Sequence, residues 1–212
     1  MASSRQLPAQ TGRQPVSARG ARTREALVQA ARDVFEREGF LESRITDITA
    51  AAGVAAGSFY TYFTSKEDVF AAVMSEVEEE MLHPRLEPTH NRDDPVAVIE
   101  AANLAYLAAY RRNAKLMGLM EQVAGIDPAF REQRLRRARA FMRRNATAIR
   151  RLQADGHADP DLDAALAAEA LSAMVSRMAY FRYVLNLGNA SQPALVETLT
   201  RLWTGALGIR RR

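Results

Sequence analysis

The chain has 212 residues, of which 48% are hydrophobic and 25% are charged, a composition typical of a folded globular protein of one or two domains. It contains no cysteine, which excludes disulfides, thiolate chemistry and cysteine zinc sites. No apolar run is long enough to cross a membrane, and the N-terminal residues lack the apolar core of a secretory signal. We therefore expect a cytoplasmic protein that has no membrane partner.

The net charge of +4 is distributed unevenly along the chain. Residues 1–24 contain five arginines and no acid, whereas residues 25–80 contain four basic and twelve acidic side chains. Residues 1–22 are rich in Pro, Ser, Gln and Arg without periodicity, which predicts a disordered basic arm. The remainder is rich in Ala, Leu, Arg and Glu and lacks β-branched alternation, so the predicted fold class is all-α.

Two helices are predicted after this arm. Thr23 is placed to cap the first helix, and Gly39 ends it. Phe40 would then fold back against Phe35, the apolar contact that accompanies such an ending. Ser43 is placed to cap the second helix, whose apolar residues follow helical spacing.

Residues 53–63 predict a turn at Gly53 followed by a very short helix. At 100° per residue, Phe59 and Phe63 share one face and anchor this helix. The opposite face is small and polar and is bordered by tyrosines; its residues are Gly57, Ser58, Tyr60, Thr61 and Tyr62. A surface with little bulk and polar edges suits an element that enters the DNA major groove.

Further helices are predicted along the rest of the chain. The fourth begins at the capping pattern of Ser65 and Asp68 and ends before Pro84. Proline or cap residues then open a series of helices, with expected ranges 95–113, 115–124, 127–155, 161–187 and 193–209.

Residues 23–75 resemble the DNA-binding domain of the tetracycline-repressor (TetR) family. The motifs that carry the resemblance are Thr-Arg-Glu-x-Leu-x-x-Ala-Ala-x-x-x-Phe from Thr23, Gly39-Phe40, Ile45-x-x-Ile48, Ala51-Ala52-Gly53-Val54, the run from Gly57 to Phe63, and Ser65-Lys66-Glu67-Asp68. The resemblance implies a homodimer that binds a pseudo-palindromic double-stranded DNA operator. It also implies a helix-turn-helix domain with a connecting helix over residues 23–82. A ligand-binding and dimerisation domain would then occupy residues 85–212.

The same resemblance assigns roles within the helix-turn-helix. Ser58 and Thr61 occupy positions that approach bases, and Thr46 occupies one that reaches bases or phosphates. Phosphate contacts are implied for Tyr60, Tyr62 and Lys66. Arg44 and Gly57 complete the candidate DNA-binding set.

The sequence departs from the family pattern at Ala55-Ala56, where the family often has a polar residue followed by Lys or Arg. This departure removes a phosphate contact from the isolated domain. Ser58 and Thr61 cannot make the bidentate base contacts of Arg or Asn, so DNA shape should contribute to specificity. Arg22 or Arg24 is a candidate for the minor groove, and the alternative is that both are solvated.

The C-terminal half offers weaker signals. Aromatic and methionine side chains expected where helices converge are candidates for a ligand pocket: Tyr106, Tyr110, Met117, Met120, Phe141, Met174, Met178 and Tyr180. For any single one of them, an ordinary core position is the favoured alternative. An apolar stripe on the last helix is the candidate dimer interface: Leu195, Leu199, Leu202 and Trp203. The arginines of residues 131–151 are interpreted mainly as a solvated face, with an acidic ligand as the alternative.

The leading hypothesis is a transcriptional repressor that a small apolar or amphipathic effector releases from its operator. The alternative is a ligand-independent DNA-binding protein whose C-terminal core is filled. We expect no enzymatic activity, no cofactor and no metal, because His83, His90 and His157 lack metal-ligand spacing and no phosphate loop or nucleophile elbow is present.

Overall fold

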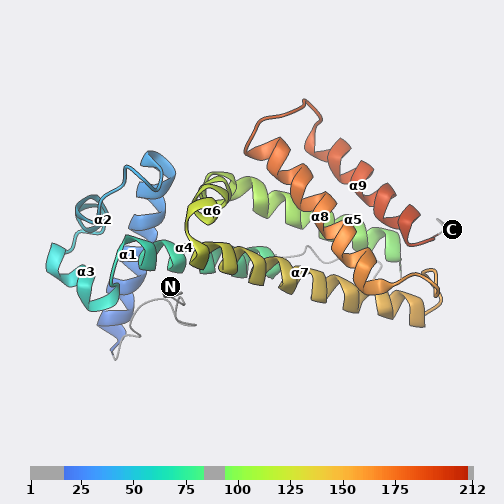
Figure 1. The fold of residues 1–212 in the computed structure, drawn as a ribbon, viewed down its shortest axis with the longest axis horizontal. Helices are drawn as coiled ribbons and strands as arrows, with labels where there is room; N and C mark the ends of the chain where they lie inside the picture. Colours follow the sequence, from blue (N-terminus) through green and yellow to red (C-terminus); the bar gives the residue numbers. More distant parts are fainter. Residues whose placement is uncertain (1–16, 84–93, 210–212) are drawn as a thin grey trace, which may run out of the picture. The chain divides into compact units, whose positions relative to one another are not determined.

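The computed structural model describes residues 17–83 and 94–209 of the chain, and throughout these residues the regular structure is helical (Figure 1). The predicted all-α fold class is therefore confirmed. The helices are α1 Ala18–Glu38, α2 Ile45–Ala51, α3 Ala56–Tyr62, α4 Lys66–Leu82, α5 Pro95–Arg112, α6 Ala114–Ile126, α7 Pro128–Ala154, α8 Ala164–Tyr183 and α9 Gln192–Ala206.

Helix α1 begins earlier than the sequence predicted. Its cap is Ser17, whose side chain accepts a hydrogen bond from the amide of Gly20 at 3.1 Å. Thr23 lies inside the helix, where its hydroxyl donates to the carbonyl of Arg19 at 3.1 Å. Residues 18–22 are thus helical, and the predicted disordered arm was wrong for them. Ser17 and Thr23 are both cap-forming types, and alanine and arginine between them favour helix. Residues 1–16 lie outside the described part of the chain.

The chain forms two compact units. Unit 1 comprises Met1–Glu79 and Lys115–Arg134, and unit 2 comprises Glu80–Ala114 and Leu135–Arg212. Helices α4 and α7 each contribute residues to both units. This division differs from the contiguous one expected from the sequence, in which all residues after position 85 form one domain.

The core of unit 1 is built around phenylalanines. Gly39 has a positive φ of 83° and ends α1, and Phe40 turns back so that its ring lies 5.8 Å from that of Phe35, as predicted. Phe70 of α4 contacts both rings, at 5.1 Å from Phe35 and 4.9 Å from Phe40. Phe130, at the start of α7, lies 5.3 Å from Phe70. These tilted and edge-on pairs fix α1, α4 and the start of α7 against one another.

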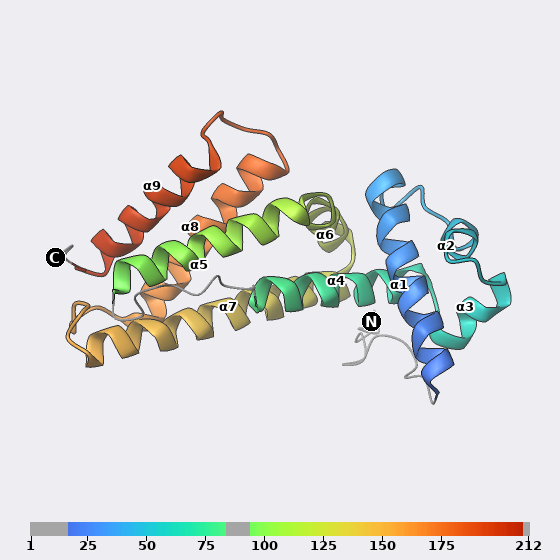
Figure 2. The same ribbon diagram turned by 180° about the vertical axis from the view of Figure 1, so that it is seen from behind.

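In unit 2, α5, α8 and α9 lie side by side in both views (Figures 1 and 2). Pro95 opens α5, as the sequence predicted, and Asp94 before it is the N-cap. A buried hydrogen bond of 3.2 Å joins Asn103 of α5 to Thr200 of α9. Helix α8 is shorter than expected, because Asp163 rather than Asp161 caps it and it ends at Tyr183.

Candidate DNA-binding site

Helices α2 and α3 are joined by a tight turn. Gly53 has a φ of 66°, a left-handed conformation that glycine adopts without strain. The amide of Val54 donates to the carbonyl of Thr49 at 3.0 Å, which closes the turn directly after α2. The two short helices and this turn form a helix-turn-helix, in which the second helix is the one that reads the major groove.

Helix α3 is anchored as the sequence predicted. Phe59 is fully buried and Phe63 is 1% exposed, and their rings lie 5.7 Å apart. Tyr60 is 60% exposed, and its ring meets Phe59 edge-on at 5.4 Å. Thr61 is exposed, and Ser58 and Tyr62 are half-buried. The buried phenylalanines hold α3 while small polar groups and tyrosine hydroxyls remain accessible.

Gly57 lies on the accessible side of α3. A methyl group added there would meet no other atom of the described chain within 4 Å. Packing within the protein therefore does not require glycine, although glycine in a helix costs about 1 kcal/mol relative to alanine. The described structure therefore gives no packing reason for glycine at this position.

At the start of α2, Arg44 and Thr46 are both exposed. Arg44 is the N-cap residue, and its amide donates to the carboxylate of Asp47 at 3.2 Å. The predicted cap, Ser43, is buried instead and its hydroxyl donates to the carbonyl of Phe40 at 2.9 Å. The Arg44 guanidinium and the Thr46 hydroxyl thus lie at the surface, on the helix preceding α3.

Lys66 does not have the free ammonium expected of a phosphate ligand. Its Nζ donates to three carbonyl oxygens, at 2.6 Å to Phe40, 3.1 Å to Leu41 and 2.8 Å to Ser43. An ammonium has three N–H donors, so all are used. It also lies 4.8 Å above the Phe40 ring. The phosphate contact implied for Lys66 is therefore corrected to a structural role, in which α4 holds the turn between α1 and α2.

Replacing Lys66 with methionine should lower the free energy of unfolding by about 1–3 kcal/mol, because the apolar stem stays and the three carbonyls lose a charged donor. The measurement is urea denaturation. The other lysine, Lys115, is exposed on α6 and supplies the matched control, Lys115→Met, which should change stability little. Equal stability of the two variants would contradict the role assigned to Lys66.

Arg24 is half-buried in the single chain. Its guanidinium lies 5.1 Å from the centre of the Phe63 ring, against the end of α3. In the single chain this side chain therefore packs on the anchor of α3, and its minor-groove role stays a prediction. Arg22, two residues before Arg24 on α1, is exposed.

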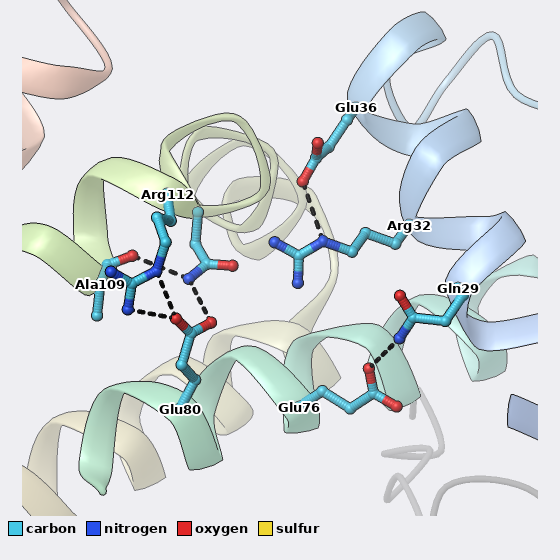
Figure 3. A network of polar contacts seen from close by, with 8 residues as sticks. Gln29, Arg32, Glu36, Glu76, Glu80, Ala109 and Arg112 are labelled. Carbon is cyan, nitrogen blue, oxygen red and sulfur yellow. Dashed lines mark hydrogen bonds and ion pairs between the residues drawn. The ribbon is translucent and has the colours of Figure 1, made fainter. Parts of the chain in front are cut away.

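Several acidic residues of unit 1 take part in contacts within the unit. Figure 3 shows Gln29 of α1 donating to Glu76 of α4 at 3.0 Å, and Arg32 paired with Glu36 at 3.3 Å. Burial raises the pKa of Glu76 above its ordinary value, although Arg32 and Arg24 act in the opposite direction. Asp68 is buried and accepts from the amide of Thr64 at 2.9 Å. Helix α3 itself carries no acid that would repel phosphates.

The candidate pocket residues are distributed over both units. Tyr106 lies 6.0 Å from Tyr110 and 5.5 Å from Phe141, ring centre to ring centre, so these three come together in unit 2. Met117 and Met120 are buried and belong to unit 1. On α8, Met174 is half-buried and Met178 is 39% exposed, and Arg177 lies 5.4 Å from the Tyr180 ring.

The candidate dimer residues fall on two faces of α9. Leu195, Leu199 and Trp203 are at most 9% exposed within the single chain, whereas Leu202 is 50% exposed. The first three face the core of their own chain, where α9 packs on α5, so their assignment to a partner interface is corrected. A second, exposed stripe of α9 is available instead and contains Ala194, Thr198, Leu202 and Ala206.

Several polar contacts of unit 2 were not predicted from the sequence. Glu80 accepts two hydrogen bonds from Arg112, at 2.8 and 2.6 Å, and one from Asn113 at 2.9 Å (Figure 3). Arg144 donates to the carbonyl of Leu82 at 2.6 Å. No local sequence signal identifies these pairs, because their members lie 32 to 62 residues apart.

Within the described residues, none of the helices is long and apolar enough to span a membrane.

Residues 27–73 match the family described as bacterial regulatory proteins of the tetR family. The HTH-type transcriptional repressor BepR of Brucella suis is 31% identical over 96 residues, which cover 44% of this chain and 45% of that protein. The HTH-type transcriptional repressor DhaR of Mycobacterium sp. is 47% identical over 53 residues, covering 25% of this chain and 27% of that protein. The chain thus spans less than half the length of these curated relatives.

Solved structures share the fold over most of the chain. SmeT, the repressor of the Stenotrophomonas maltophilia multidrug efflux pump SmeDEF, matches with a TM-score of 0.67 at 23% identity, covering 87% of this chain and 91% of that one. A TetR-like transcriptional regulator from Rhodococcus sp. RHA1 matches with a TM-score of 0.63 at 21% identity, covering 92% and 100%. The match to the tetR family of bacterial regulatory proteins thus covers the helix-turn-helix and the start of α4, and the remaining described helices share the fold of these solved structures.

Proposed function

We propose that this protein is a transcriptional repressor that binds a pseudo-palindromic DNA operator as a homodimer and is released from it by a small amphipathic molecule. The DNA-binding part of this proposal rests on the exposure pattern of α3. Buried Phe59 and Phe63 fix this helix, and Gly57 and Thr61 are exposed to solvent. Side chains of this size admit the helix to the major groove, and tyrosine hydroxyls beside them suit phosphate oxygens.

The proposed homodimer rests on exposed apolar side chains of unit 2. Leu166 of α8 is 64% exposed and Leu202 of α9 is 50% exposed within the single chain. The stripe that contains Leu202 also has small residues, which let a second helix approach closely. A two-fold axis would pair each helix with its own copy and place two α3 helices in successive major grooves, about 34–36 Å or a multiple apart.

Replacing Leu202 with glutamate should convert the dimer into a monomer, because each copy would bury an unpaired charge in the interface. Sedimentation velocity measures the change. Leu104, which is 47% exposed on α5, provides the control variant Leu104→Glu, which should remain dimeric. A Leu202→Glu protein that sediments as wild type would exclude α9 from the interface.

Release by a small molecule is supported by analogy with SmeT, for which a complex with triclosan has been solved. A ligand releases DNA only if it binds the DNA-incompetent state more tightly. Electrophoretic shifts with fragments that flank the protein's own gene test both parts. We expect one fragment to be bound and then released by a compound from the pathway of the neighbouring genes. Failure to shift any fragment would refute the DNA-binding proposal.

A further inference from the structure

Helix α7 carries a larger excess of positive charge than any other described helix. Its residues 128–154 contain nine arginines and one acid, Glu132, on one unbroken helix (Figures 1 and 2). At 100° per residue, four of the exposed arginines fall within an arc of about 60° and follow one line along the helix. These residues form the arginine stripe: Arg136, Arg139, Arg143 and Arg150. At about 1.5 Å per residue, the stripe is about 21 Å long.

Three cations of the stripe have no paired acid. Among the described residues, no carboxylate forms an ion pair with Arg136, Arg143 or Arg150. Backbone amides of α8 and, to a smaller extent, the charge of Arg150 lower the pKa of Asp163, so one acid lies near this end of the stripe. The stripe is therefore an exposed row of cations whose charge is mostly left to solvent or to a partner.

The helix-turn-helix, by contrast, offers few cations to DNA. Residues 25–80 contain four basic and twelve acidic side chains. Arg32 and Arg37 pair with glutamates of α1 at 3.3 and 2.6 Å, and Lys66 is held by three carbonyls. Arg44 is the remaining basic residue and is exposed. Since cations that contact phosphates supply most non-specific DNA affinity, this part of the chain accounts for little of it.

The residues around the stripe favour a nucleic acid over two other acidic partners. A helix that lies on a membrane inserts its apolar side among the lipids, but the apolar side of α7 is packed within the chain, where Phe141 is 8% and Ile149 1% exposed. Protein interfaces have an apolar or aromatic core, whereas the positions between the arginines are Ala140 and Thr147. Arginines without large apolar neighbours suit the phosphate oxygens of a regular backbone.

We propose that the arginine stripe of α7 binds the phosphate backbone of duplex DNA without regard to sequence, as a surface separate from α3. The inference goes beyond the proposed function, because it requires neither an operator nor an effector. The stripe lies in unit 2, whereas α3 belongs to unit 1. A guanidinium donates paired, charge-assisted hydrogen bonds to phosphate oxygens. Duplex DNA carries one negative charge per about 1.7 Å of its axis, so a length equal to that of the stripe presents about 12 charges.

Such a surface assists the search for an operator. Phosphate contacts hold a protein on any DNA sequence and allow it to slide and hop, whereas base contacts select the site. The arginine stripe supplies contacts of the first kind, and α3 supplies those of the second. The two surfaces can therefore be inactivated separately.

The stripe variant replaces Arg136, Arg143 and Arg150 together with glutamine in the full-length protein. All three side chains are exposed, so the free energy of unfolding should change little. The control variant removes the same charge from exposed positions on other helices: Arg111→Gln, Lys115→Gln and Arg201→Gln. Fluorescence anisotropy over a series of salt concentrations measures affinity for the operator and for a labelled duplex of random sequence. Flotation measures binding to vesicles of phosphatidylserine and phosphatidylcholine.

The stripe variant should bind the random duplex about 10- to 100-fold more weakly at low salt, because three phosphate contacts that release counterions are lost. The slope of log affinity against log salt should flatten by about 3 per chain. The control variant should stay close to wild type in both quantities. Gly57→Leu keeps every cation, so it should retain most of its affinity for the random duplex while it loses preference for the operator.

The inference is overturned if the stripe variant binds the random duplex as wild type does, or if both variants lose affinity equally, which would indicate a general effect of net charge. Vesicle binding that depends on the stripe, without a change in DNA binding, would assign the surface to membranes instead. Failure of the proposed function is a different result. The wild-type protein would then prefer no operator sequence, whether or not its affinity for the random duplex depends on the stripe.

Discussion

Replacing Gly57 with leucine should abolish specific operator binding while leaving the fold intact. Space around Gly57 is open within the described chain, and leucine favours helix more than glycine does, so the free energy of unfolding should stay equal or rise by up to about 1 kcal/mol. On DNA, the added side chain would occupy the site of closest approach. A disturbed base contact costs about 1–3 kcal/mol per half-site, so two half-sites predict a loss of at least about 30-fold.

Gly125 supplies the matched control for this experiment. It is also an exposed helical glycine with open space around it, but it lies on α6. Gly125→Leu should therefore change stability by a similar amount but leave operator affinity unaltered. Anisotropy titrations with the operator fragment and urea denaturation of both variants give the comparison. Full operator affinity in Gly57→Leu would show that α3 does not enter the groove by this face.

The second large effect concerns two adjacent aromatic residues of α3 with opposite environments. Phe59 is fully buried, so Phe59→Ala should lower the free energy of unfolding by about 3–5 kcal/mol and reduce DNA binding through loss of structure. Tyr60 is 60% exposed, so Tyr60→Ala should cost less than about 1 kcal/mol of stability. Its effect should appear in DNA binding, because a hydroxyl available to phosphate is removed.

Tyr60→Phe separates the hydroxyl from the ring. If the hydroxyl holds a phosphate, this variant should lose operator and non-specific affinity to the same degree, because phosphate contacts carry no sequence information. Circular dichroism melting and anisotropy with operator and random DNA measure these quantities. A Tyr60→Ala protein that melts far below wild type, or that binds both DNAs as wild type does, would contradict the assignment.

Local sequence signals predicted the helix-turn-helix well. Phe59 and Phe63 are four residues apart and therefore share a face of any helix, so their burial follows from spacing alone. The return of Phe40 onto Phe35 follows from the glycine between them, and the start of α5 follows from Asp94 and Pro95. In each case the chemistry that decides the structure lies within about five residues of chain.

Features that depend on distant residues were not predictable in this way. The three carbonyls bound by Lys66 lie 23 to 26 residues away, so a surface cation and an internal one have the same local sequence. The apolar stripe of α9 was equally ambiguous, because a helix buries such a stripe against its own chain or against a partner. Helix α9 packs on α5, and Leu195 and Leu199 are buried within the single chain, so this stripe is buried against its own chain.

The start of α1 was missed for a different reason. Ser17 and Thr23 are both good caps, and the sequence signal does not rank them. The chain extends the helix to the earlier one because alanine and arginine add helical residues at little cost, with Gly20 tolerated in the first turn. Arg19 and Arg22 consequently project from a helix and not from an irregular arm.

Selection of binding sites from a random DNA library with the full-length chain tests the central claim most directly. A homodimer that presents two copies of α3 should enrich a pseudo-palindromic sequence whose half-site centres lie about 10 base pairs, or a multiple of that, apart. Gly57→Leu, run in parallel, should enrich no such sequence. If the wild-type protein enriches no sequence, or only one without two-fold symmetry, the account of this chain as a dimeric operator-binding regulator is contradicted.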